Sequence, residues 1–277
     1  MELSTFLTIP RTEVQPVAPR TVVWAAGGTR RYAVLQGIAG DDYYAWALER
    51  QLDGAALLLD HGVRTLFMPI IGPPQIREVG HYRERLLPMQ QLLISKPALL
   101  RYAALNCRVR LLGHETLPGL SDIATTLEQA TANLQQATIW WVFIEDEHAL
   151  VSAMLRAAVA AQASTWAEAV RAYYGEDLAP VDVFIGFGKL EAGYLLPPLL
   201  GEQADLYWAE SPSYAMTEAD VRRIIWDHRF ARQTWMAEKN QRYAGIVDSP
   251  LPDYYARHDI LGIGQTIHGF WRPQPTP

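Results

Sequence analysis

Six short apolar runs, separated by longer segments of mixed polarity, constrain the fold of this chain more than any other feature. They cover residues 21–25, 65–71, 108–112, 138–144, 181–187 and 205–209. Within them most successive positions are apolar instead of alternating with polar ones, as expected when helices cover both faces of a sheet. We therefore predict an α/β fold with a single open, mostly parallel six-stranded sheet flanked by helices.

The segments between the runs have the composition of helices. Residues 41–61, 82–106, 121–136 and 147–174 have helical length and are rich in Ala, Leu, Glu and Arg. Thr217 followed by Asp220 is typical of a helix start, so a further helix is expected to run from there to about residue 236. The alternation of strands and helices predicts right-handed crossovers between parallel strands.

A single domain is expected to cover residues 1–277. One sheet with flanking helices can use this length, and no linker or internal repeat divides the chain. Residues 237–277 are rich in Pro, Tyr and Gly and lack long periodic runs. We predict that this tail is irregular and packs on the body or on a partner subunit.

The composition excludes several classes of protein. Hydrophobic residues make up 49% of the chain and charged residues 19%, which excludes a disordered polymer. The net charge of -6 argues against non-specific nucleic-acid binding, which needs a positive surface. We expect no signal peptide, because Glu2 places an acid where a signal peptide would carry basic charge. We expect no transmembrane segment, because no apolar run reaches about 18 residues. Cys107 is the only cysteine and is expected to be a buried thiol in a cytoplasmic protein.

Residues 25–32, directly after the first run, form the main candidate for a ligand site. Gly27 and Gly28 allow the backbone to approach a ligand, and a helix starting there would present N–H groups to an anion. Arg30 and Arg31 add two guanidinium groups, which suit a diphosphate leaving group. The alternative is a surface turn with two solvated arginines, because Gly-Gly turns and Arg pairs are common.

The group Asp41, Asp42, Tyr43 and Tyr44 opens the next predicted helix. The two acids can simply complement the helix dipole. In a functional interpretation, Asp41 or Asp42 reaches a magnesium ion on the diphosphate, although no third acid stands at a matching helical spacing. Tyr43 is a candidate to relay a proton or to stabilise a cation with its ring face.

Several other enzyme classes lack their motifs here. The seven histidines show no zinc-binding pattern, and no Gly-x-Ser-x-Gly elbow, Walker loop or Gly-x-Gly-x-x-Gly motif is present. The acids at 145–147 follow the fourth predicted strand, and we interpret them as helix-start residues instead of ligands.

Together these segments resemble the cis-prenyltransferase superfamily, best known from undecaprenyl diphosphate synthase. Its first-strand motif, Asp-Gly-Asn-x-Arg-Trp, binds the allylic diphosphate, and residues 27–32 occupy its place as Gly-Gly-Thr-Arg-Arg-Tyr, without the aspartate. Its late motif, Arg-x-Gly-Gly-Glu, helps to bind isopentenyl diphosphate, and residues 186–190 stand there as Gly-Phe-Gly-Lys-Leu, without the arginine and the glutamate. The resemblance therefore implies one diphosphate site and no chain elongation.

Several stretches are similar to a narrower branch, the bacterial tuberculosinol (isotuberculosinol) synthase group of diterpene synthases, which includes a kolavelool synthase. They are residues 28–31, 41–43, 173–176, 184–188, 212–218, 262–264 and 268–271. The diphosphate-binding residues that this resemblance implies are Gly28, Thr29, Arg30 and Arg31. It makes Tyr43 the catalytic residue that assists water attack or deprotonation, and it places Tyr44 and Tyr82 in the pocket.

The resemblance also bears on the cofactor. Members of the branch carry an aspartate where Gly27 stands, near the diphosphate and magnesium. Without it, either Asp41 or Asp42 holds a magnesium ion, or the two arginines carry the leaving group alone.

The activity implied by the resemblance is that of a homodimeric diterpene synthase. It would ionise a bicyclic C20 prenyl diphosphate of the kolavenyl or halimadienyl (tuberculosinyl) type and quench the allylic cation with water, giving an alcohol and diphosphate. Two alternatives stay open, a non-catalytic partner subunit of a cis-prenyltransferase and prenyl transfer to a nucleophile such as adenosine.

Overall fold

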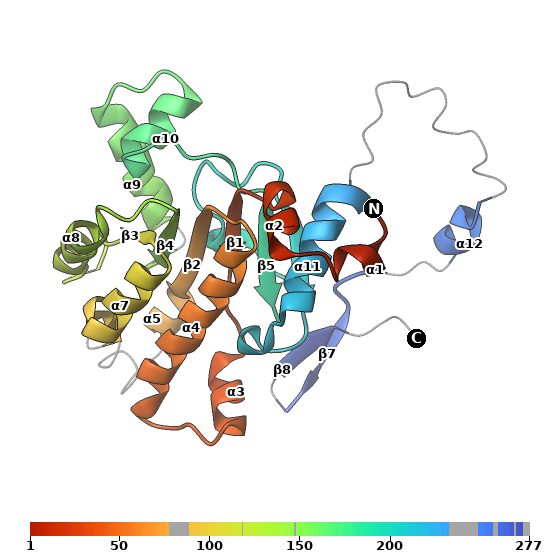
Figure 1. Cartoon of the computed structure of the whole chain (residues 1–277). Helices are drawn as coiled ribbons and strands as arrows, with labels where there is room; N and C mark the ends of the chain where they lie inside the picture. The colour runs from red at the N-terminus through yellow and green to blue at the C-terminus, as the bar shows by residue number, and fades with distance from the viewer. Residues whose placement is uncertain are drawn as a thin grey trace.

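The centre of the protein is a six-stranded parallel sheet in the order β3-β4-β2-β1-β5-β6 (Figure 1). The computed structural model describes residues 1–77, 89–117, 119–146, 148–232, 249–256, 260–268 and 270–273. The strands are β1 (Thr21–Trp24), β2 (Thr65–Ile71), β3 (Cys107–Leu112), β4 (Ala137–Phe143), β5 (Val183–Phe187) and β6 (Asp205–Ala209). The predicted α/β fold is confirmed, and each predicted run contributes one strand.

Both faces of the sheet are buried, which explains why the strand sequences are continuously apolar. Successive side chains of a strand point to opposite faces. In β1, Val22 and Trp24 belong to the core on one face, whereas Val23 belongs to the core on the other face. Each of these side chains is at most 1% exposed.

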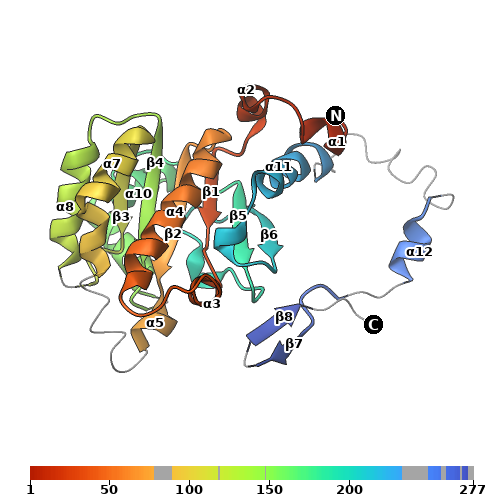
Figure 2. The ribbon, with the colours of Figure 1, turned by 60° about the horizontal axis from the view of Figure 1, so that its bottom comes forward.

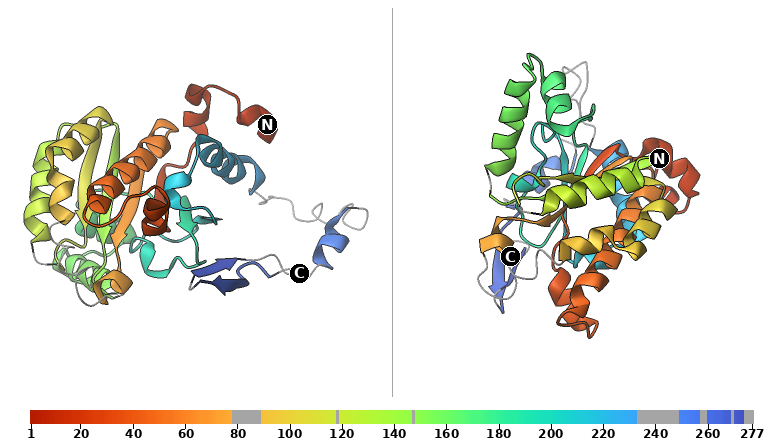
Figure 3. Two further views of the ribbon diagram at one scale, coloured as in Figure 1. Left: turned by 90° about the horizontal axis from the view of Figure 1, so that it is seen from below. Right: turned by 90° about the vertical axis from the view of Figure 1, so that its left-hand side faces the viewer.

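Helices cover the two faces unequally (Figure 2). Helices α4, α7, α8 and α11 contribute to the core around Trp24, whereas α9 and α10 contribute to the core around Val23 (Figure 3). The helices are α1 (Leu3–Phe6), α2 (Arg11–Val14), α3 (Thr29–Leu35), α4 (Asp42–Asp60), α5 (Pro73–Arg77), α7 (Lys96–Ala104), α8 (Leu120–Thr131), α9 (Ala149–Ala160), α10 (Trp166–Tyr174), α11 (Glu218–Trp226) and α12 (Leu251–Tyr255).

Two predicted helices are interrupted by capping residues. The segment 147–174 forms α9 and α10 because Gln162 is left-handed, with a φ of 53°, and Thr165 starts a new helix through a capping box with Glu168. In the segment 82–106, Ser95 accepts a hydrogen bond from the Ala98 N–H and starts α7 after the short turn η2 (Leu92–Ile94). Residues 82–88 lie outside the described residues.

The end of the chain contains regular elements that the sequence analysis did not predict. Within the segment predicted to be irregular lie α12 and an antiparallel hairpin of β7 (Gly264–Ile267) and β8 (Phe270–Pro273). Strands of four residues show too few periods to reveal a pattern. Helix α11 ends at Trp226 and continues as a π-helical turn, Asp227–Ala231, and the predicted end near residue 236 falls outside the described residues.

Cys107 is fully buried in β3, as predicted, and burial raises the pKa of its thiol to about 12. In the part of the chain that the structure describes, no helix is both long and apolar enough to cross a membrane.

Candidate active site

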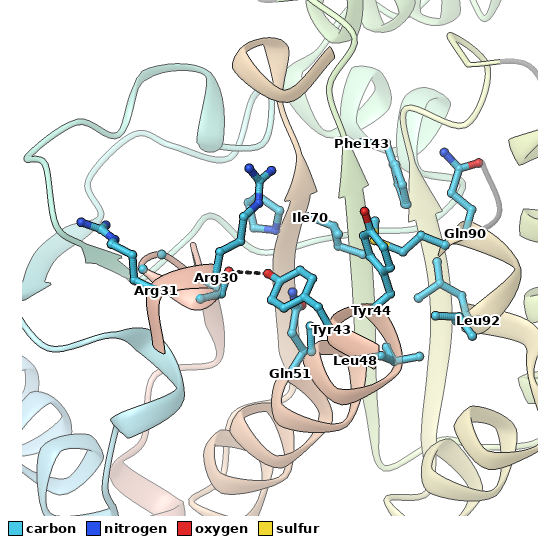
Figure 4. Close-up of a pocket in the computed structure, with 18 of the residues that line it drawn as sticks. Arg30, Arg31, Tyr43, Tyr44, Leu48, Gln51, Ile70, Gln90, Leu92 and Phe143 are labelled. Atoms are coloured by element: carbon cyan, nitrogen blue, oxygen red, sulfur yellow. Dashed lines mark hydrogen bonds between the residues drawn. The ribbon is translucent and has the colours of Figure 1, made fainter. Parts of the chain in front are cut away.

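The carboxyl ends of β1 and β5 border the crevice where open α/β sheets bind their ligands. The connection after β1 leads to β2 on one side of this crevice, and the connection after β5 leads to β6 on the other side. A cavity of about 370 Å³ lies at the end of β1, within the usual size range of small-molecule sites. Its wall is formed by the turn after β1, the first half of α4, the end of β2, the segment 89–93, Phe143 and Phe270 (Figure 4).

The turn after β1 combines a left-handed glycine with a close contact to β5. Gly28 has a φ of 70°, a conformation that favours glycine, and precedes α3. A Cβ atom at Gly27 would lie 3.0 Å from the Phe187 carbonyl oxygen, closer than nearly all real Cβ contacts. The aspartate that the resemblance implies for this position would therefore require the Phe187 backbone to shift by a few tenths of an ångström.

Arg30 and Arg31 both line the cavity and leave α3 in different directions. The side chain of Arg30 points toward the end of β2, and that of Arg31 points away from it. The Arg31 guanidinium carbon lies 4.1 Å from the centre of the Phe270 ring, a cation–π contact. Both arginines are exposed at the cavity mouth. Because α3 has only seven residues, we assign the attraction for an anion to these two charges and not to the helix dipole.

Tyr43 lies beside the arginines and is tied to the same turn. Its hydroxyl is 2.7 Å from the Thr29 Oγ1 atom, and either group can be the donor. Its ring packs edge-on against Tyr44, with the ring centres 5.5 Å apart. A hydroxyl pair and an aromatic face are thus held next to the cationic mouth.

The opposite side of the cavity is mostly apolar, and its polar groups are the amides of Gln51 and Gln90. Here the wall is formed by Leu48 of α4, Ile70 of β2, Leu92, Leu93 and Phe143. The cavity therefore has a cationic mouth and a mostly apolar interior, which suits a molecule with an anionic head and a hydrocarbon body.

The structure gathers most of the predicted site residues in one place. Gly28, Thr29, Arg30, Arg31, Tyr43 and Tyr44 all line this cavity. Asp41 and Asp42 do not line it; they lie exposed at the first turn of α4. Tyr82 lies outside the described residues.

The lining of the cavity does not fit a magnesium ion held by the protein. Mg²⁺ sites in proteins use carboxylates, and the described lining includes hydroxyl and amide oxygens but no Asp or Glu side chain. The described residues also contain no cluster of three or more His, Cys, Asp or Glu side chains that could hold a metal. We therefore assign no step of the reaction to a metal.

Most of the cavity wall was not predicted residue by residue, and two further contributions come from distant segments. Phe270 reaches the cavity from the hairpin, and Ser213 hydrogen-bonds to Gly27 behind it. Both belong to stretches that resemble the diterpene synthase branch, residues 268–271 and 212–218. That resemblance was the only signal that could have pointed to them, because both residues come from segments far from the turn in sequence.

Comparison with known proteins places this chain in a family. No family model matches the chain. The fold resembles lavandulyl diphosphate synthase from Lavandula x intermedia in complex with dimethylallyl diphosphate, with a TM-score of 0.65, 13% identity, and coverage of 78% of this chain and 97% of that one. It also resembles a probable undecaprenyl diphosphate synthase from Campylobacter jejuni, with a TM-score of 0.57, 16% identity and the same coverages. These likenesses show the fold.

Sequence similarity narrows the assignment. The chain is 34% identical to the (+)-kolavelool synthase of Herpetosiphon aurantiacus over 279 residues, which cover 99% of this chain and 96% of the relative. The chain belongs to the cis-prenyltransferase superfamily, in the kolavelool synthase branch. This branch assignment confirms the resemblance seen in the sequence, and it makes the chain an enzyme.

A second relative belongs to the same comparison. The tuberculosinyl adenosine transferase of Mycobacterium tuberculosis is 27% identical over 288 residues, covering 96% of each protein. Its name describes transfer to a nucleoside, so members of this branch of cis-prenyltransferases differ in what they do with the prenyl group.

Proposed function

We propose that this protein is a diterpene synthase that ionises a bicyclic C20 prenyl diphosphate and quenches the allylic cation with water. The kolavenyl and halimadienyl (tuberculosinyl) diphosphates are the candidate substrates. The observation that carries the proposal is the two-ended cavity, with Arg30 and Arg31 at its mouth and an apolar wall behind. The kinship with (+)-kolavelool synthase supports the same substrate class.

In the proposed reaction the diphosphate lies on the two arginines. The bond between the allylic carbon and the bridging oxygen breaks, and the electron pair leaves with the diphosphate. Charge-assisted hydrogen bonds from guanidinium groups stabilise the charge that develops on the departing group. The aromatic rings of Tyr43 and Tyr44 face the cavity and stabilise the cation through their π-systems.

Water then completes the reaction. The water oxygen forms a bond to the cationic carbon, and the resulting oxonium loses a proton. The hydroxyl pair of Tyr43 and Thr29 orients the water and passes this proton to a diphosphate oxygen or to solvent. The products are a diterpene alcohol and protonated diphosphate, so atoms and charge balance.

A small neighbouring cavity supports quenching instead of elongation. It shares Gly27 and Ile70 with the main cavity, and its volume is about 150 Å³. This cavity is large enough to hold water beside the reacting carbon. Its one lysine, Lys189, is paired with Glu191 at 3.2 Å. The described lining of this cavity holds no second cation that could form a clamp with Lys189 for the diphosphate of a second substrate.

Transfer to a nucleoside is the second candidate, and the name of the Mycobacterium tuberculosis relative favours it. Both candidates share the ionisation step and differ only in the nucleophile. The non-catalytic partner subunit is not favoured, because the chain belongs to a branch of enzymes.

The test is incubation of the purified protein with geranylgeranyl, kolavenyl and halimadienyl diphosphates, with and without magnesium and adenosine, followed by product identification. We expect an alcohol from a bicyclic substrate. Arg30→Ala and Arg31→Ala should each lower the rate by a hundredfold or more, since losing a charged hydrogen-bond donor to the leaving group costs about 2 to 4 kcal/mol of barrier.

The matched control is Arg171→Ala, which removes an exposed arginine that pairs with Asp177 near α10, away from the cavity. It should leave turnover unchanged. Wild-type rates in both Arg30→Ala and Arg31→Ala, or no product from any of the three substrates, would contradict the proposal.

A further inference from the structure

The short turn η4 (Ser213–Ala215), which follows β6, supports the turn after β1 from behind. The backbone N–H of Ser213 donates to the Gly27 carbonyl at 3.0 Å, and the Ser213 hydroxyl donates to the same carbonyl at 3.1 Å. Ser213 is only 1% exposed. A single buried residue therefore makes two hydrogen bonds to a residue that precedes it by 186 positions.

This restraint acts where the chain is intrinsically loose. Gly27 and Gly28 have no side chains to fix their backbone, and glycine has the largest conformational freedom of all residues. Two donors on one carbonyl oxygen fix the orientation of the peptide that joins them. On the same turn, a Cβ atom at Gly28 would lie 3.4 Å from Pro212, so the neighbour of Ser213 also packs against it. Arg30 and Arg31 follow directly, and their starting positions depend on this peptide.

The same turn also supports Tyr43. The Tyr214 ring meets the Trp46 ring edge-on, with centres 5.5 Å apart, and the Trp46 ring lies 6.5 Å from the Tyr43 ring. The segment after β6 therefore contacts both parts of the cavity wall, the arginine-bearing turn directly and Tyr43 through one tryptophan. One turn therefore fixes the position of both parts relative to each other.

From this geometry we infer that Ser213 is a positioning residue for the diphosphate, acting through the Gly27 carbonyl. The inference rests on the proposed function, since it assumes that the diphosphate binds at Arg30 and Arg31. Removing the Ser213 hydroxyl takes away one of the two bonds and leaves the backbone one. Diphosphate affinity should fall about three- to tenfold, the usual effect of one lost hydrogen bond.

The experiment measures binding of inorganic diphosphate to the full chain by calorimetry, together with KM and kcat for the accepted prenyl diphosphate. The variants are Ser213→Ala and Ser213→Thr, and Ser213→Cys replaces Ala if Ala does not fold, because its thiol is a weak donor. The matched control is Thr131→Val, which removes an equally buried hydroxyl that bonds to Leu127 and Val109 within α8 and β3. Thermal unfolding of each variant reports folding.

The inference is supported if Ser213→Ala binds diphosphate more weakly and has a higher KM, while Ser213→Thr regains wild-type binding. Thr131→Val should bind diphosphate like the wild type. Wild-type diphosphate binding in folded Ser213→Ala or Ser213→Cys would overturn the inference. An equal loss in Thr131→Val would also overturn it, because the effect would then be one of general stability. If Arg30→Ala and Arg31→Ala bind diphosphate normally, the proposed function itself fails, so the two failures are distinguishable.

Discussion

Replacing Tyr43 with phenylalanine removes one hydroxyl from the cavity and leaves the aromatic ring in place. That hydroxyl lies 2.7 Å from the Thr29 Oγ1 atom, and Thr29 directly precedes the two arginines. The variant therefore separates two roles of Tyr43, the ring that stabilises a cation and the hydroxyl that orients water.

The loss of the Tyr43 hydroxyl should affect both stability and alcohol formation. Loss of one half-buried hydrogen bond should lower the free energy of unfolding by about 0.5 to 1.5 kcal/mol. Loss of a group that handles the water proton should lower alcohol formation by about 10² to 10⁴-fold. Ionisation depends on Arg30 and Arg31, which stay in place, so the cation should instead lose a proton and give a hydrocarbon.

The assay follows diphosphate release and alcohol formation separately in single-turnover reactions. Tyr43→Phe should release diphosphate while forming little alcohol, and the Thr29→Val variant should show a smaller effect in the same direction. In a double-mutant cycle the two effects should not add, because both changes break the same hydrogen bond.

The control for this prediction is Tyr174→Phe, which removes a hydroxyl that donates at 2.7 Å to the Pro198 carbonyl. Tyr174 belongs to the core around Val23, on the other face of the sheet from Trp24. It should lower stability without changing the products. Tyr43→Phe with the wild-type alcohol yield and rate would refute the role assigned to the hydroxyl.

Two further predictions concern contacts between distant segments. Phe270→Leu should raise KM by about two- to fivefold, because the Arg31 guanidinium loses a cation–π contact of about 0.5 to 1 kcal/mol. Phe270→Tyr keeps an aromatic ring and should keep the wild-type KM. Equal KM values for Phe270→Leu and the wild type in steady-state kinetics would contradict this. Hydrogen bonds from Arg11 and Arg222 lower the pKa of Glu218 from 4.5 to about 2. This carboxylate therefore contributes stability above about pH 4.5 that is lost as the pH falls toward 2. In thermal unfolding between pH 7 and pH 2.5, the melting temperature should fall less for Glu218→Gln than for the wild type. Equal falls in the two proteins would contradict this prediction.

Much of the fold could be predicted from the local sequence. A strand covered on both faces must be apolar at successive positions, so the six runs were visible without any knowledge of their neighbours. The helix boundaries were less visible, since Thr165 and Glu168 start α10 inside a segment of uniformly helical composition. That capping box was present in the sequence but was outweighed by the composition around it.

The candidate site could be predicted from the sequence only in part. Gly28, Thr29, Arg30 and Arg31 are consecutive, and Tyr43 follows within one helix start, so their proximity could be expected. The cavity that these residues share could not be predicted, because its apolar wall comes from β2, β4 and the segment 89–93.

The amino-acid sequence by itself determined which segments become strands and where two cations stand beside a flexible glycine pair, because both depend on residues close together in the chain. Only the tertiary structure decided that Ser213 hydrogen-bonds to Gly27, that Phe270 contacts Arg31, and that a side chain at Gly27 would press against Phe187 of β5. The physical reason is that such contacts join residues more than 150 positions apart, and their partners are chosen by the packing of the whole sheet and its connections.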